Sequence, residues 1–356
     1  MRFYLNNVWM LCIRLLTVLI FYQVCRILYF TYNINYFQSI DLETYIYILF
    51  GSIKFDISAV MYLNLLLIFF SLIPIKLLIK KWYKSLLAYL FIVTNSIGIL
   101  SNIVDIFHYP FTKNRFTISS INEFSNEKNI GSFILRFTYD YWFIIPLMII
   151  IVYILYFISK RTKTKSSTFS LKTKPFLVSI ILMLSIFTLT IFGCRGSFIY
   201  KNRPITISNA GKYTNSPNEI SLVINTPFSL IRTSHLKDLT VINYFTEKEI
   251  EKIYPVVKQY ENNQKKQKNI VVIILESMAS EYFQFYNKDV ENYQGYTPFL
   301  DSLLNHSYTS YNSFSNGKKS IDAVPSILAS IPEVQFNFSL SKFFTNKIEG
   351  IGNILK

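Results

Sequence analysis

Long apolar stretches, separated by shorter polar connections, dominate the first half of the chain. Five of them are long enough, or nearly so, to cross a hydrocarbon core of about 30 Å, which takes about 20 residues. They run approximately over residues 15–30, 45–75, 86–107, 141–159 and 175–193. The first stretch resembles a secretory signal, but no small-residue cleavage site follows it and four more stretches do. The pattern therefore predicts a bundle of five transmembrane helices within residues 1–194.

Basic residues in the connections predict how these spans are oriented. The loops after the second and fourth stretches are rich in lysine and arginine, whereas the loop after the first carries Asp41 and Glu43 and no basic residue. Loops rich in Lys and Arg stay in the cytoplasm. We therefore expect a cytoplasmic amino terminus, an extracytoplasmic carboxyl-terminal domain and a location in the cell (inner) membrane.

The composition agrees with a membrane protein. Of the 356 residues, 51% are hydrophobic and 16% are charged, whereas soluble domains carry about 25% charged residues. The net charge of +15 would suit a nucleic-acid partner, but much of it lies in the two basic loops, so we predict no such partner. Three cysteines without a partner at a useful spacing are interpreted as packing residues: Cys12, Cys25 and Cys194.

The chain turns polar after the fifth stretch. Residues 195–267 predict an extracytoplasmic linker that contains one helix, and its first part, rich in Asn, Ser, Pro and Gly, is expected to lie along a surface. Thr246 and Glu249 form a capping box at the start of the helix. This helix is predicted to run to about Asn262, with a kink at Pro255.

A different pattern begins near residue 268. The six consecutive apolar residues 270–275 are mostly β-branched, which predicts a strand buried on both faces of a parallel sheet. Thr297 and Pro298 predict a helix start. Residues 307–314 alternate like a strand, and a turn then leads to another helix near Ser320. We therefore expect residues 268–356 to be the start of an α/β domain with a doubly wound sheet.

Two side chains of this region are candidates for chemistry. Glu276 follows the predicted strand, at the end where open α/β sheets bind ligands. Ser320 starts a predicted helix, where backbone N–H groups favour an anion, and the preceding Lys318 and Lys319 are candidate substrate-binding residues. A divalent metal held partly by Glu276 would activate the Ser320 hydroxyl as a nucleophile. The alternatives are a solvated glutamate and a serine that only caps its helix.

Three segments of this region together resemble the lipoteichoic acid synthase-like phosphoglycerol transferases, which belong to the sulfatase/alkaline-phosphatase superfamily. The segments are NIVVIILESMAS (269–280), YTPFLDSL (296–303) and SNGKKSIDA (315–323). The resemblance covers about residues 269–331, and a multi-span anchor before an outward-facing domain agrees with it.

This resemblance implies roles for both candidate residues. Glu276 would be a metal ligand, and Ser320 would be both a metal ligand and the nucleophile, at a position where the best-known members carry Thr. The implied metal is divalent and of the Mn²⁺ type. The implied reaction moves a phosphoglycerol-type head group from a membrane phospholipid donor, through a phospho-enzyme, to a cell-envelope glycan or glycolipid acceptor.

Two features depart from the wider family pattern. Sulfatases proper carry Cys/Ser-x-Pro/Ala-x-Arg, whereas Asp322 and Val324 follow Ser320 here, which disfavours hydrolysis of sulfate esters. The family also completes its metal site with downstream Asp and His residues, so the chain is interpreted as truncated after the nucleophile region. None of the three histidines follows an aspartate directly: His108, His235 and His306. A phosphoethanolamine transferase and a truncated non-catalytic membrane relative therefore remain as alternatives.

Charged residues also lie within or beside the apolar stretches. Lys54 and Asp56 interrupt the second stretch, Asp105 ends the third, and Lys113 and Arg115 follow it at about head-group depth. Charges in a membrane are costly and usually face a partner or a wet cavity. We hypothesise that Lys54, Lys113 and Arg115 help to bind the phosphate of an anionic lipid. The alternative is a structural ion pair of Lys54 with Asp56 or Asp105, or snorkelling of the lysine.

Overall fold

The chain divides into two compact units. One comprises Met1–Lys237 and Phe338–Glu349, and the other comprises Asp238–Asn337 and Gly350–Lys356. The computed structural model describes residues 2–118, 120–121, 130–162, 173–199, 203–234, 243–255, 269–317, 319–333, 338, 341, 343 and 346–355. The boundary between the units lies inside the predicted linker over residues 195–267.

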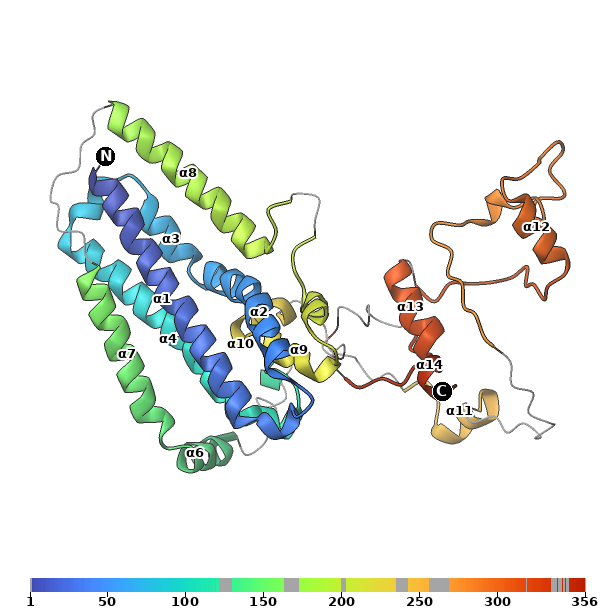
Figure 1. The fold of residues 1–356 in the computed structure, drawn as a ribbon, viewed down its shortest axis with the longest axis horizontal. Coiled ribbons are helices and arrows are strands. Elements are labelled where there is room, and N and C mark those ends of the chain that lie inside the picture. Colours follow the sequence, from blue (N-terminus) through green and yellow to red (C-terminus); the bar gives the residue numbers. More distant parts are fainter. Residues whose placement is uncertain are drawn as a thin grey trace. The chain divides into compact units, whose positions relative to one another are not determined.

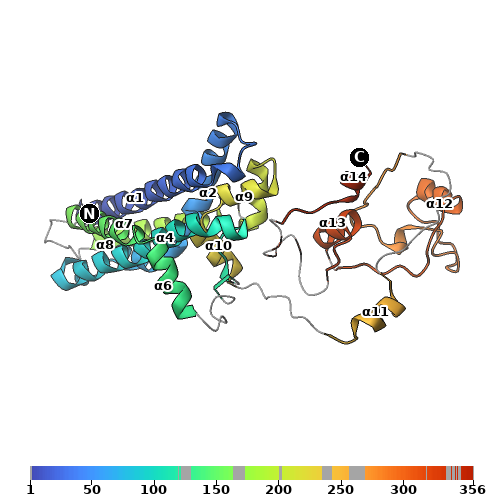
Figure 2. The same cartoon turned by 90° about the horizontal axis from the view of Figure 1, so that it is seen from below.

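The first unit is a bundle of long helices, as Figure 1 and Figure 2 show. Its described helical elements are α1 (Arg2–Tyr32), η1 (Ile34–Tyr36), α2 (Leu42–Leu63), α3 (Leu65–Leu72), η2 (Lys76–Ile79), α4 (Lys81–Thr112), α6 (Ile130–Asp140), α7 (Ile144–Arg161), α8 (Thr173–Arg195), η3 (Ile207–Tyr213), η4 (Pro217–Glu219), α9 (Ile220–Val223) and α10 (Thr226–Thr233). Five of them are long and apolar enough to cross a membrane, as the sequence predicts: α1, α2, α4, α7 and α8.

The second apolar stretch is divided at Asn64 and not at its charged residues. Helix α2 continues through Lys54 and Asp56, and the backbone leaves the helical conformation at Asn64, with φ −97° and ψ 12°. The side-chain amides of Asn64 and Asn95 exchange hydrogen bonds of 2.9 and 2.8 Å. Because an asparagine amide competes with backbone hydrogen bonds, this pair explains the joint and fixes it to α4.

The segment after the fifth span is packed into the bundle, although its polarity predicts a surface linker. Gly196 ends α8 in the left-handed conformation (φ +67°), and its N–H donates to Phe192 O at 2.9 Å. Farther along, residues 219–229 are all buried. Helix α9 contacts α1 and α2, and α10 contacts α2 and α4. The polar groups of this segment find their partners on those helices, so their polarity does not keep them at the surface.

The second unit contains short helices. Its described helical elements are α11 (Glu247–Ile253), η5 (Ser280–Tyr282), α12 (Pro298–Asn305), α13 (Ser320–Ala329) and α14 (Ile351–Ile354). Thr297 and Pro298 stand at the N-cap and first position of α12, as predicted. The Thr246 N–H donates to Glu249 Oε2 at 2.8 Å, which confirms the capping box.

The predicted sheet and the predicted length of α11 are not found. None of the residues that the structure describes lies in a strand, and residues 270–275 are between 42% and 81% exposed. A strand needs a neighbour for its N–H and C=O groups, and no described segment supplies one to residues 270–275 or 307–314. Helix α11 ends at Ile253, short of Asn262, because the residue before Pro255 disfavours the helical conformation. Residues 256–268 lie outside the described part.

Candidate functional site

The two residues that the sequence singles out for chemistry are in direct contact. Ser320 Oγ donates a hydrogen bond of 2.7 Å to Glu276 Oε1. Both side chains are exposed to solvent. A hydroxyl that donates to a carboxylate has its oxygen lone pairs free for an electrophile or a cation. The pair therefore has the arrangement that an activated serine requires.

The structure distinguishes this pair from an ordinary helix cap. Lys319 occupies the N-cap position of α13, and its backbone N–H donates to Asp322 Oδ2 at 3.2 Å. Ser320 is the first helical residue, and its hydroxyl makes the contact with Glu276. Because Asp322 caps the helix, the Ser320 side chain is not needed for that purpose. The N-terminal end of α13 also favours negative charge beside this hydroxyl.

The backbone is strained directly after the glutamate. Ser277 adopts a left-handed conformation with φ +56°, which residues other than glycine and asparagine rarely take. Its hydroxyl lies 3.4 Å from Glu276 Oε1, the oxygen that also accepts from Ser320. Such strain is common at functional sites. Here it turns the chain immediately after the carboxylate that faces Ser320.

The neighbouring candidates are only partly defined. Lys319 is the N-cap of α13, and Lys318 lies outside the described residues. His306 caps the carboxyl end of α12. His108 belongs to the other unit, where Nδ1 lies 3.6 Å from Asp105 Oδ1. His235 also falls outside the described residues. Within the described residues, no group of three or more His, Cys, Asp or Glu could hold a metal ion.

The bundle contains a second polar cluster, which the sequence reveals only in part. Arg26 donates to both carboxylate oxygens of Asp56, at 2.7 and 2.6 Å, and each side chain is 1% exposed. Arg26 Nε also donates to Leu222 O at 2.7 Å. Asp56 accepts two more hydrogen bonds, from Gln23 (2.8 Å) and from Asn225 (2.7 Å). This buried ion pair thus joins α1 and α2 to α9 and to the N-cap residue of α10.

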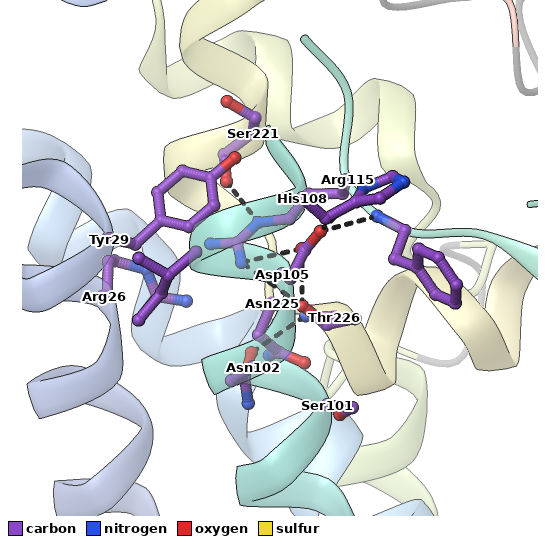
Figure 3. Close-up of polar contacts among 12 residues, drawn as sticks. Arg26, Tyr29, Ser101, Asn102, Asp105, His108, Arg115, Ser221, Asn225 and Thr226 are labelled. Carbon is purple, nitrogen blue, oxygen red and sulfur yellow. Dashed lines mark hydrogen bonds and ion pairs between the residues drawn. The ribbon is translucent and has the colours of Figure 1, made fainter. Parts of the chain in front are cut away.

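A similar arrangement surrounds Asp105, as Figure 3 shows. Arg115 Nη1 donates to Asp105 Oδ2 at 3.1 Å, and Arg115 Nε donates to Ser221 O at 2.7 Å. Thr226 Oγ1 donates to Asp105 Oδ2 at 2.7 Å, and the Thr226 N–H donates to Asn102 Oδ1 at 3.0 Å. The two arginines therefore bind carbonyl groups of α9, and the two aspartates bind the first residues of α10. Together these contacts fix the segment in the bundle.

Each of the three cations predicted to bind a lipid phosphate has its own surroundings in the bundle. Arg115 is 5% exposed, and its guanidinium lies 3.7 Å over the ring of Tyr29. The ammonium of Lys113 lies 3.2 Å over the ring of Tyr36. Lys54 is half-buried on α2, and within the described residues it forms no ion pair with Asp56 or Asp105. Asp56 and Asp105 are instead paired with Arg26 and Arg115, so neither forms the predicted ion pair with Lys54.

Arg26, the cation that pairs with Asp56, was not predicted from the sequence. It lies inside the first apolar stretch, and an arginine there calls for a partner as much as Asp56 does. The cysteines agree more closely with expectation. Cys25 and Cys194 are buried and free, whereas Cys12 is free and exposed.

Residues 268–356 match the family model Sulfatase. The matched region contains both Glu276 and Ser320, and the match supports the sulfatase/alkaline-phosphatase superfamily for this part of the chain. No curated protein and no solved structure matches the chain. The helical bundle with five potential membrane spans therefore precedes a region related to a superfamily of hydrolases and transferases.

Proposed function

We propose that the protein is a membrane-anchored transferase of the sulfatase superfamily, with Ser320 as its nucleophile. The hydrogen bond of 2.7 Å between Ser320 Oγ and Glu276 Oε1, inside the region that matches the Sulfatase model, carries this proposal. The five apolar helices favour a lipid substrate, because they hold the chain in the membrane where that lipid resides. The proposed donor is a phosphoglycerol-type membrane phospholipid, and the proposed acceptor is an extracytoplasmic glycan or glycolipid.

The proposed reaction has two displacements at phosphorus. Ser320 Oγ attacks the phosphodiester, the new Oγ–P bond forms, and the bond from phosphorus to the diacylglycerol oxygen breaks. The hydroxyl proton leaves toward Glu276 Oε1, which already accepts it in a hydrogen bond, and diacylglycerol departs after taking up a proton. An acceptor hydroxyl then attacks the same phosphorus, gives up its proton and releases Ser320. The N-terminal end of α13 stabilises the negative charge of the phosphoryl oxygens.

A divalent metal fits this pair in chemical type. Hard cations such as Mg²⁺ and Mn²⁺ prefer oxygen ligands, and Glu276 and Ser320 would supply two. The described residues do not provide the remaining ligands as a group. When bound, the cation would lower the pKa of the Ser320 hydroxyl and polarise the phosphoryl oxygen. The chain's own residues orient the nucleophile and accept its proton.

A head-group transfer assay in vesicles tests the proposal. The protein is reconstituted with phosphatidylglycerol that carries a labelled head group, and release of diacylglycerol is measured with added Mn²⁺ and with a chelator. We expect Ser320→Ala to abolish release and Glu276→Gln to lower it strongly. Ser326→Ala is the matched control on the same helix, because the Ser326 hydroxyl bonds to Asp322 O and Ile331 O and not to Glu276.

The donor lipid distinguishes the alternatives. Release from phosphatidylethanolamine but not from phosphatidylglycerol would replace the proposed head group by phosphoethanolamine, with the same nucleophile. Equal release by the wild type, Ser320→Ala and Glu276→Gln would remove the catalytic assignment. No release from either lipid would favour a non-catalytic membrane protein.

A further inference from the structure

We infer that Lys54 on α2 and Lys212 on η3 form a binding site for the phosphate of an anionic phospholipid. The site lies in the helical unit, whereas Ser320 belongs to the other unit. It rests on the proposed function in one respect, because the lipid that it binds would be the donor of that reaction. The inference follows from three features of the two lysines. They lie at head-group depth, they lie close to each other, and within the described residues neither has an acidic partner.

Helix α8 marks the edge of the hydrocarbon core. It is apolar from Phe176 to its end at Arg195. Ser58 Oγ on α2 donates to Cys194 O at 2.7 Å, so Ser58 lies level with that end of α8. A Cβ at Gly193 would lie 3.5 Å from Ile57, which confirms that the two helices pack side by side at this level. The apolar helix α8 thus places the boundary of the core close to Ser58, and the apolar stretch of α2 and α3 continues into the core from there.

Lys54 lies just beyond this boundary. It precedes Ser58 by about one helical turn, which is roughly 6 Å along α2. The direction is away from the core, because α2 enters the bundle from the end at which α8 leaves it. The lysine is half-buried, so its methylene groups are covered while the ammonium reaches the head-group layer. Lipid phosphates lie at this depth.

Element η3 brings the second lysine to the same place. The ring of Tyr213 covers Gly51, where a Cβ would overlap it, and packs edge-on against Phe55 with centroids 6.4 Å apart. Gly51 and Phe55 flank Lys54 on α2, and Lys212 precedes Tyr213 in η3. This packing places Lys212 beside α2 near Lys54, where their like charges repel. Their proximity is therefore unfavourable unless an anion lies between or beside them.

The protein itself does not supply that anion. Asp56 is held by Arg26, Gln23 and Asn225. Asp105 is held by Arg115 and Thr226. Glu219, which is also buried, accepts from Asn215 N at 2.8 Å and from a serine hydroxyl at 2.9 Å. Within the described part of the chain, neither lysine has an acidic partner. A phosphate from the surrounding lipid satisfies both charges at this depth.

Lipid association in nanodiscs tests the inference with a binding readout. Spin-labelled phosphatidylglycerol is compared with spin-labelled phosphatidylcholine around the wild-type protein. We expect Lys54→Met and Lys212→Met each to weaken the preference for phosphatidylglycerol about fivefold, the usual effect of one lysine near an anionic surface. Lys54→Arg should retain the preference, because it keeps the charge. Lys248→Met, an equal change of charge on exposed α11, is the matched control and should have no effect.

Further measurements distinguish a lipid phosphate from a free phosphate, and the binding site from the proposed function. Millimolar glycerol 3-phosphate and inorganic phosphate should not displace the lipid; displacement by either would contradict a lipid site. An undiminished preference in both methionine variants would also overturn the inference. If the wild type binds phosphatidylglycerol selectively but transfers no head group, the proposed function fails and the binding site stands. If transfer occurs and Lys54→Met changes neither binding nor KM, the site fails and the function stands.

Discussion

The ion-paired cluster of the bundle and the Glu276–Ser320 pair use similar groups in opposite ways. Arg26 and Asp56 are each 1% exposed and are linked by two hydrogen bonds, with further partners from four other residues. Glu276 and Ser320 are exposed and linked by one hydrogen bond. The buried carboxylate of Asp56 accepts several hydrogen bonds, and these hold helices together. An exposed carboxylate whose donors are two serine hydroxyls is available to a substrate or a cation.

The comparison shows that charge in an apolar stretch is a poor guide to catalysis by itself. The buried pairs around Asp56 and Asp105 fix α9 and α10 to the bundle, and their polar groups find partners within the protein. Burial makes such pairs sensitive to the loss of one member, because the other charge stays without compensation. Because the Glu276–Ser320 pair is exposed, its loss should change stability little, whereas the proposed function requires it.

The largest expected effect on stability follows from breaking the Arg26–Asp56 pair. Asp56→Ala should lower the free energy of unfolding by about 3–5 kcal/mol, because it leaves the Arg26 guanidinium buried without a counter-charge. Unfolding in detergent micelles measures the change. The exposed pair Arg136–Asp140, with atoms 3.9 Å apart, provides the control: Asp140→Ala should have no measurable effect. Equal effects of both substitutions would contradict a structural role for the buried pair.

A smaller loss is expected where η3 rests on α2. Gly51→Ala places a methyl group against the ring of Tyr213, and such overpacking typically costs about 1–3 kcal/mol. The same unfolding measurement detects it. Gly211→Ala is the control in η3 itself, because a Cβ there meets nothing within 4 Å. If Gly51→Ala is as stable as Gly211→Ala, η3 does not pack on α2 as described.

The smallest effect concerns the exposed capping box of α11. Hydrogen bonds from the backbone and side chain of Thr246 lower the pKa of Glu249 below its ordinary value of 4.5. The ionised carboxylate therefore stabilises the helix fully above that pH, and the contribution is lost as the pH falls through the lowered pKa. The protection factor of the Ile250 amide, which donates to Thr246 O at 3.0 Å, should fall in that range once the intrinsic exchange rate at each pH is divided out. Glu249→Gln should remove this pH dependence; an unchanged dependence would exclude Glu249 as its source.

The apolar periodicity predicts the membrane half of the fold well. All five predicted stretches are long helices, because hydrophobic length alone determines whether a segment can span a bilayer. The break at Asn64 is not predictable from the same signal, since it depends on a partner amide at Asn95 on α4. The burial of residues 219–229 is likewise set by distant partners and not by local composition.

The candidate site was accessible to sequence reasoning because residue types and motif spacing indicate it directly. Glu276 and Ser320 lie 44 residues apart and still meet. The expected strand over residues 270–275 is not found, because a parallel strand forms only with neighbouring strands. The described residues supply none. Lys212 was also not predicted, since a lysine in a polar segment does not indicate that η3 packs beside Lys54.

The central claim is that Ser320 becomes covalently attached to the head group. The direct measurement is mass spectrometry of peptides after the protein, in phosphatidylglycerol vesicles with Mn²⁺ and without acceptor, is quenched in acid. We expect a phosphoglycerol adduct on Ser320 that is absent from Ser320→Ala, reduced in Glu276→Gln and present in Ser326→Ala. Diacylglycerol release with an unmodified Ser320, or an adduct on another residue, would contradict it.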